Sequence, residues 1–152
     1  LLHVVLLRAM GWGGGHMHEF TFAQGSYASV EPGLDLPFDV QDESRVSLRN
    51  ALKASATFTW LYDYGDNWQH KVKVERAEVM GFALKHPLCI TGQGACPPDD
   101  VGGEPGFENF LQAMADPAHP EHDELTGWYG GSFDPAAFSA DDVQAQLDEI
   151  KL

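Results

Sequence analysis

The sequence predicts an α+β fold, in which an antiparallel-type sheet with a central hairpin is packed by an N-terminal helix and a helical C-terminal part. Apolar residues alternate with a period of two in residues 16–22 and 57–79, and they recur at helical spacing in residues 1–10 and 107–150. No repeated strand–helix–strand pattern joins these segments, which argues against a parallel sheet. With 152 residues, of which 43% are hydrophobic, the chain is expected to form one domain over residues 1–152.

The N-terminal segment predicts a helix followed by a strand. Residues 1–10 are apolar on nearly every side and precede Gly11, a common residue type at the C-terminal end of a helix. Residues 16–22 then alternate with a period of two. This alternation places His16 and His18 on the same face of the strand.

The middle of the chain combines loops with a short helix and a hairpin. Residues 31–44 are rich in Pro and Asp and predict a loop, and residues 47–52 predict a short helix capped by its first residue, Ser47. Residues 57–64 and 68–79 predict two strands of a hairpin.

The turn of that hairpin contains Gly65 and Asn67, residue types that adopt the positive φ needed in tight turns. Residues 81–105 hold many Gly and Pro residues and predict a long structured loop. The predicted hairpin and this loop separate the N-terminal elements from the helical C-terminal part.

Three helices are expected after this loop. Residues 107–115 carry an apolar stripe at helical spacing, and residues 121–129 form a second short helical segment that ends before Gly130. Ser139 followed by Asp142 matches the start of the last helix. The aromatic residues Trp128 and Tyr129 are expected in the core.

The charge of the chain is concentrated in one half. The whole chain has a formal net charge of −14, and residues 86–152 contribute 13 acidic residues and one basic residue, Lys151. Because Lys and Arg side chains supply most of the affinity for phosphate backbones, direct nucleic-acid binding is disfavoured. The expected partner is a protein with a basic surface that meets residues 86–150.

The termini and cysteines indicate a compartment. No apolar run approaches the 18 residues of a membrane span, so no membrane association is expected. The apolar start at Leu1 lacks the basic region and cleavage site of a signal peptide, which predicts a cytoplasmic location with Cys89 and Cys96 reduced. The absence of an initiator Met indicates that a preceding segment is missing.

The first candidate site is a set of His and Asp residues. Two imidazoles two residues apart on a strand can chelate a metal, as His16 and His18 would. Asp63, Asp66 and His70 lie near one end of the hairpin. With His16, His18 and His70 as ligands, this set suits a divalent metal such as zinc, and His70 oriented by Asp66 suits general acid–base chemistry. The competing interpretation is that these residues form turns and hydrogen-bonded packing contacts.

The second candidate site lies in the predicted loop of residues 81–105. His86, Cys89 and Cys96 would supply three metal ligands, with Asp99 or Asp100 as the fourth. The two cysteines are separated by six residues, which is longer than the spacing of common zinc knuckles. The alternative is a pair of reduced thiols in a loop held by Pro and Gly.

Six ordered motifs carry a family resemblance. They are Met10-Gly11-Trp12, His16-x-His18-Glu19-Phe20, Tyr62-Asp63-Tyr64-Gly65-Asp66-x-Trp68-x-His70, Cys96-Pro97-Pro98-Asp99-Asp100-x-Gly102-Gly103, Asp116-Pro117-x-His119-Pro120-Glu121-His122 and Gly130-Gly131-x-Phe133-Asp134-Pro135. In this order they resemble the plasmid pRiA4b ORF-3-like family over nearly the whole chain.

The resemblance implies an α+β domain of unknown function. It also implies a strand before the first helix, which this chain is expected to lack, and a third cysteine in many relatives where this chain has Val101. A position that is often aromatic in relatives is His86 here. Some relatives are labelled resolvase-like or repressor-like.

The leading functional hypothesis is a non-catalytic binding or interaction module. The alternative is a metal-dependent hydrolase-type enzyme that uses the His/Asp set. A role in DNA recombination or regulation rests on the family labels alone, and the acidic half of the chain argues against it.

Overall fold

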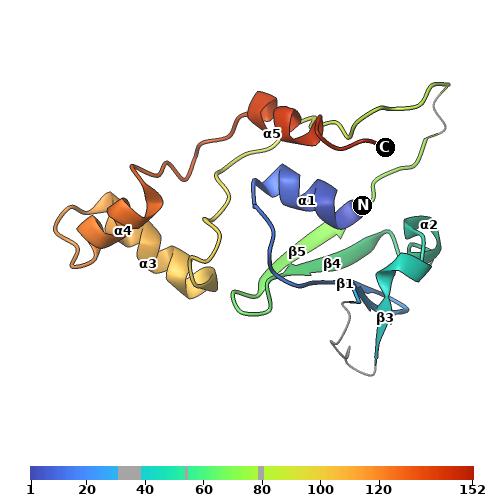
Figure 1. Ribbon diagram of the computed structural model, residues 1–152, viewed down its shortest axis with the longest axis horizontal. Helices are drawn as coiled ribbons and strands as arrows, with labels where there is room; N and C mark the ends of the chain where they lie inside the picture. Colours follow the sequence, from blue (N-terminus) through green and yellow to red (C-terminus); the bar gives the residue numbers. More distant parts are fainter. Residues whose placement is uncertain (31–38, 54, 79–80) are drawn as a thin grey trace. The chain divides into compact units, whose positions relative to one another are not determined.

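The computed structural model describes residues 1–30, 39–53, 55–78 and 81–152 (Figure 1). The chain divides into two compact units. The helical unit is built from residues 1–14 and 81–152, and the sheet unit from residues 15–80. The sheet unit is therefore inserted between the two segments that form the helical unit, and the expectation of one domain over residues 1–152 stays a prediction.

The described residues of the sheet unit form five strands in the order β3-β2-β1-β4-β5. All neighbouring strands are antiparallel except β2 and β3, which are parallel. The predicted α+β class and antiparallel-type sheet are confirmed, whereas the parallel pair was not predicted. The hairpin of β4 and β5 occupies one side of the sheet rather than its centre. The strands are β1 (His18–Phe22), β2 (Gly25–Ala28), β3 (Val40–Asp42), β4 (Thr57–Tyr62) and β5 (Trp68–Lys73).

The two faces of this sheet differ in polarity because side chains alternate along each strand. Trp60 lies opposite Phe20 on one neighbouring strand and opposite His70 on the other. Trp60 and Tyr62 on this face are fully buried. Thr59, the residue before Trp60 on β4, points to the opposite face of the sheet. The apolar face therefore forms the core of the sheet unit.

The turn between β4 and β5 differs in detail from the expectation. Positive φ angles of 58° occur at Asp63 and Asn67, not at Gly65. The Gly65 N–H donates to Asp63 Oδ1 at 2.8 Å, and the Asn67 N–H donates to the Asp63 carbonyl. Asp and Asn adopt the left-handed region more readily than most residues, so the turn uses them in place of glycine.

Other expectations for the sheet unit are confirmed in part. The helix α2 (Leu48–Ala51) begins after Ser47, whose Oγ accepts the Asn50 N–H at 3.3 Å. The segment predicted as a loop over residues 31–44 contains β3 and the start of the 3-10 helix η1 (Glu43–Arg45), while residues 31–38 lie outside the described residues. The second hairpin strand is shorter than predicted and ends at Lys73.

The helical unit contains four helices, α1 (Leu2–Met10), α3 (Gly103–Ala115), α4 (His122–Tyr129) and α5 (Ala140–Leu147). As predicted, α1 ends at Gly11, which has a φ of 83°. Helix α1 packs along α5 (Figure 1). Leu7 and Leu147 are buried, and Arg8 lies 3.8 Å from Glu149. None of the helices among the described residues has the length and apolarity to cross a membrane.

Local contacts explain where α5 begins and how the preceding loop is held. Ser139 Oγ accepts the Asp142 N–H at 3.2 Å, which confirms the predicted cap. Gln144 on α5 accepts the Cys89 N–H and donates to the Pro87 carbonyl. The loop is therefore attached to α5 through its backbone.

Candidate functional site

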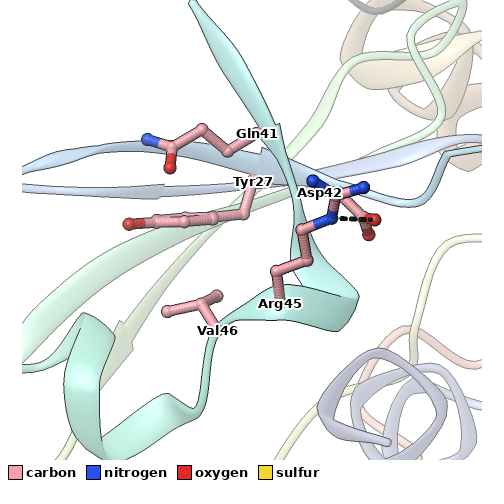
Figure 2. Close-up of a pocket in the computed structure, with 5 residues that line it drawn as sticks. All are labelled: Tyr27, Gln41, Asp42, Arg45 and Val46. Atoms are coloured by element: carbon pink, nitrogen blue, oxygen red, sulfur yellow. Dashed lines mark hydrogen bonds and ion pairs between the residues drawn. The ribbon is translucent and has the colours of Figure 1, made fainter.

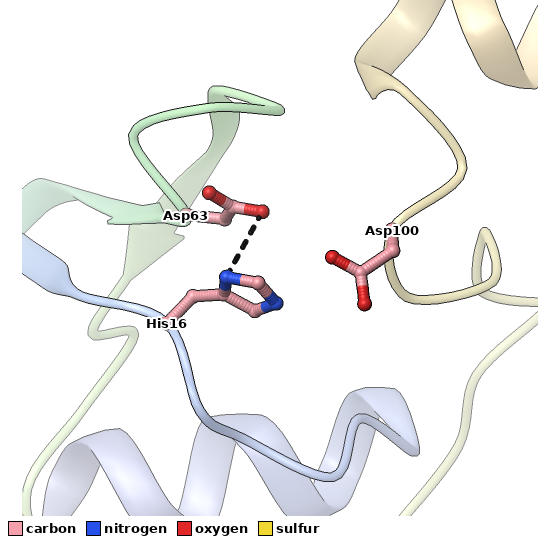
Figure 3. Close-up of side chains that lie close together, drawn as sticks. All are labelled: His16, Asp63 and Asp100. Carbon is pink, nitrogen blue, oxygen red and sulfur yellow. Dashed lines mark ion pairs between the residues drawn. The ribbon is translucent and has the colours of Figure 1, made fainter.

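His16 and Asp63 form a close pair in the sheet unit (Figure 3). His16 precedes β1, so the expectation that it lies on the strand beside His18 is wrong. Its Nδ1 lies 3.5 Å from Asp63 Oδ2, and its ring meets the Tyr62 ring edge-on with centroids 5.7 Å apart. Asp63 is buried, with 8% of its surface exposed. Two of the predicted site residues are thus brought together.

His18 lies in a different environment. It is buried on the apolar face of β1, and its Nε2 donates to Glu43 Oε2 at 2.9 Å. Its ring also meets the edge of Phe20, with centroids 5.4 Å apart. Glu43 belongs to η1, in the segment predicted as a loop, and the sequence gives no signal of this pair.

His70 on the edge strand β5 packs against Trp60 of β4. Its Nδ1 donates to the Trp60 carbonyl at 3.2 Å, and the two rings lie 4.6 Å apart. Burial lowers the pKa of His70 below its ordinary value, against the opposing effect of hydrogen bonds with the Trp60 and Trp68 backbones. Asp66 lies in the turn between β4 and β5, and its pairing with His70 as an acid–base couple stays a prediction.

The structure does not assemble the predicted metal set of His16, His18 and His70. Their ring nitrogens, all in the described part of the chain, do not all lie within 4.8 Å of one another. His18 and His70 are on β1 and β5, with β4 between them, and this places their strands about 10 Å apart. His18 and His70 lie on the same face of the sheet as Trp60, but the strand order separates them.

The second predicted set is not assembled either. No three of the four described side chains His86, Cys89, Cys96 and Asp99 bring ligand atoms within 4.8 Å of one another. His86 Nδ1 donates to the Ile150 carbonyl at 2.8 Å. Burial, with a further effect of the Asp99 carboxylate, raises the pKa of the Cys96 thiol to about 12. Both cysteines are free thiols.

A pocket of about 320 Å³ opens beside β3 (Figure 2). It is lined by Tyr27, Gln41, Asp42, Arg45 and Val46. Arg45 Nε lies 3.2 Å from Asp42 Oδ2, so the two charges of the pocket compensate each other. Hydrogen bonds from Ser44 lower the pKa of Asp42. Four of these residues come from β3 and the segment after it, where the sequence predicts few ordered elements.

An exposed aromatic surface lies on α4. We define the α4 surface as Glu124, Trp128 and Tyr129. Trp128 and Tyr129 are 49% and 42% exposed, so the expectation that they are core residues is wrong. Their inner edges contact Phe110 of α3, which is fully buried, at centroid distances of 6.0 and 5.5 Å. His122 Nδ1 donates to the Ala113 carbonyl at 2.7 Å and joins the start of α4 to α3.

Helices α3, α4 and α5 share one pattern of charge at their ends. Each of α3, α4 and α5 carries acidic residues in its first turn, and none of these three described helices has a basic residue in its last turn. The C-terminal end of a helix carries a partial negative charge that basic residues usually offset. The α4 surface therefore combines exposed aromatic rings with an acidic side chain, Glu124, on a helix whose last turn has no basic residue.

Comparison with known proteins shows similarity over nearly the full chain. An uncharacterized protein, y4hQ, of Sinorhizobium fredii (strain NBRC 101917 / NGR234) is 37% identical over 153 residues, covering 98% of this chain and 77% of that protein. The crystal structure of a protein of unknown function, MM3350, from Methanosarcina mazei Go1 has a TM-score of 0.78 and 28% identity, covering 93% of this chain and 80% of that chain.

A match to a family profile assigns the chain to a family. The sequence profile described as plasmid pRiA4b ORF-3-like protein matches residues 1–142, which include every helix and strand up to the first turn of α5. The ordered motifs in the sequence pointed to the same group. The chain belongs to the plasmid pRiA4b ORF-3-like protein family.

Proposed function

We propose that this protein is a non-catalytic binding module that docks a basic segment of a partner protein on the α4 surface. The observation that carries this proposal is the exposure of Trp128 and Tyr129 on a helix that has no fully buried residue. Large aromatic side chains held half-exposed are the residues that most often dominate protein interfaces.

The aromatic rings are held in place before a partner binds. Trp128 and Tyr129 each meet the Phe110 ring edge-on, and Tyr129 also contacts Phe133 at 5.4 Å. A side chain that is already ordered loses little conformational entropy on binding. These contacts support a recognition role for the two rings, because they order the rings while leaving about half of each exposed to a partner.

The charge pattern favours a cationic ligand group. Glu124 is exposed and lies four residues before Trp128, so the two side chains share one face of α4. An Arg or Lys side chain of the partner can lie over the indole face and pair with Glu124. The negative C-terminal end of α4, at Gly130, attracts the same group.

The surrounding acidity would increase the association rate. Residues 86–152 carry 13 acidic residues and one basic residue, and such a field attracts a basic partner at long range. This contribution is screened by salt, whereas the contact with Trp128 is short-range and is screened much less. The two contributions can therefore be separated by experiment.

The test uses a fluorescein-labelled nona-arginine peptide and fluorescence anisotropy at 50 and 150 mM NaCl. We expect Trp128→Ala to weaken binding about 5- to 30-fold at both salt concentrations, the loss of a cation–π contact of about 1–2 kcal/mol. Phe82→Ala is the matched control, because Phe82 is 66% exposed in the same unit but has no place in the α4 surface.

Two outcomes would contradict the proposal. The first is unchanged affinity of the Trp128→Ala protein, with circular dichroism showing an intact fold. The second is an equal loss in Phe82→Ala, which would show that the peptide senses only the total charge and apolar area. An effect confined to Trp128→Ala and Glu124→Gln supports the proposed site.

A further inference from the structure

We infer that His16 and Asp63 together bind a divalent transition-metal ion in the sheet unit. The two atoms that would coordinate it are His16 Nδ1 and Asp63 Oδ2, which face each other at 3.5 Å (Figure 3). This inference does not depend on the proposed function of the α4 surface. It replaces the predicted set of His16, His18 and His70 with a pair that the fold brings together.

The distance between the two atoms favours a shared ion over a direct hydrogen bond. An N–H···O hydrogen bond normally spans 2.7–3.2 Å, and the pair lies beyond that range. Two ligand atoms that each lie about 2.0–2.2 Å from a tetrahedral ion are about 3.3–3.6 Å apart. His16 Nδ1 and Asp63 Oδ2 therefore have the spacing of two ligands of one ion.

Both ligand groups are fixed by the surrounding backbone. Asp63 adopts a φ of 58°, and its Oδ1 accepts the Gly65 N–H, which leaves Oδ2 directed at His16. The Asp63 N–H donates to the Met17 carbonyl at 2.9 Å and ties the turn to the residue after His16. Tyr62 contacts the His16 ring edge-on. A site ordered in this way loses little entropy when the ion binds.

The burial of the carboxylate gives a second argument. Asp63 is only 8% exposed, and a buried carboxylate is unfavourable unless charge or hydrogen bonds compensate it. The Gly65 N–H compensates one oxygen. A divalent ion at the other oxygen would neutralise the remaining charge.

The donor types define the class of metal. An imidazole nitrogen with a carboxylate oxygen suits zinc, manganese or ferrous iron. The His16 side chain is 30% exposed, so water can complete the coordination shell. Two protein ligands with water positions describe an exchangeable site rather than a closed structural one.

The experiment measures binding of ZnCl₂ to the full chain after treatment with EDTA and dialysis, by isothermal titration calorimetry. We expect one Zn²⁺ per chain, with binding weakened more than about tenfold in both His16→Ala and Asp63→Asn. Asn adopts the same positive φ and can accept the Gly65 N–H, so Asp63→Asn preserves the turn while removing the charge.

His119→Ala is the matched control, because it removes a histidine of the helical unit and should bind Zn²⁺ as the wild type does. Addition of Co²⁺ gives an independent readout, because its visible absorption band reports nitrogen and oxygen ligation and should be lost in Asp63→Asn. The inference is overturned if the wild type binds no Zn²⁺, or if folded His16→Ala and Asp63→Asn proteins bind it as tightly as the wild type. A failure of His16→Ala to fold leaves Asp63→Asn as the deciding variant.

Discussion

The imidazole of His70 lies against the indole of Trp60, with ring centroids 4.6 Å apart across two paired strands. Trp60 is fully buried, so His70 packs against a core residue of the sheet unit. The His70 Nδ1–H donates to the Trp60 carbonyl, which fixes the ring in this position. A histidine in this position acts as a packing residue whose charge is unfavourable.

This relationship predicts a pH-dependent stability. Burial lowers the pKa of His70 in the folded protein below its ordinary value of 6.5. Between the two values the unfolded chain binds more protons, so the stabilisation is present above pH 6.5 and is lost as the pH falls through the folded-state pKa. We expect His70→Phe to flatten the dependence of the free energy of unfolding on pH in this window.

Urea unfolding measured at intervals between pH 5 and 8 checks this prediction. His119→Ala serves as the control, because His119 lies in the connection between α3 and α4 rather than against the sheet core. An unchanged slope in His70→Phe would show that another group is responsible for the pH dependence.

The buried thiol of Cys96 gives a second prediction. Burial and the Asp99 carboxylate raise its pKa to about 12, from an ordinary 9.0. Because the thiolate is the reactive form, this shift lowers the reactive fraction of Cys96 near pH 8 by about 1000-fold. We expect only one cysteine of the folded protein, Cys89, to react rapidly with a disulfide reagent such as DTNB.

The thiol reaction is followed at 412 nm at pH 8, with and without 6 M guanidinium chloride. Cys89→Ser should remove the rapid phase, and denaturant should restore the reaction of Cys96 at an ordinary rate. Rapid reaction of Cys96 in the folded Cys89→Ser protein would contradict the prediction.

The parts of the fold that the sequence predicts are those set by local chemistry. Ser139 and Ser47 cap their helices as expected, and Gly11 ends α1 in the left-handed conformation. The alternation of apolar residues identified the hairpin strands. Each of these features depends on residues within a few positions of one another, so the sequence contains all the information that they need.

The candidate site depends on contacts that are distant in the sequence. His18 was placed on the correct face, but its partner Glu43 and the intervening strand β4 follow from the strand order. His16 and Asp63 were both singled out, but their pairing depends on the turn at positive φ that brings the carboxylate to the imidazole. Periodicity identifies which residues share a face of a strand, but it does not identify which strands or side chains lie next to that face.

The exposure of Trp128 was missed for a related reason. The core is the simplest expectation for a large aromatic residue, and the inner edge of Trp128 does pack against Phe110. Helix α4 has eight residues and none of them is buried, and about half of the Trp128 side chain remains exposed. Large aromatic residues are often incompletely buried, and sequence spacing cannot show how much of the ring a neighbour covers.

Two helical glycines give the last prediction, because one has no space for a side chain and the other has ample space. A Cβ placed on Gly106 of α3 would clash with the Val101 carbonyl oxygen, whereas a Cβ on Gly127 of α4 would meet nothing within 4 Å. Alanine favours a helix by about 0.5–1 kcal/mol over glycine where space permits. We therefore expect Gly127→Ala to raise the free energy of unfolding by that amount.

Gly106→Ala should have the opposite effect. The clash is with backbone rather than with a flexible side chain, so the start of α3 must move, and overpacking of this kind destabilises proteins by about 1–3 kcal/mol. Chemical unfolding of both variants under the same conditions checks the pair, since helix propensity alone predicts that both alanines stabilise the protein. Equal stabilisation by the two substitutions would show that Gly106 does not approach the Val101 carbonyl.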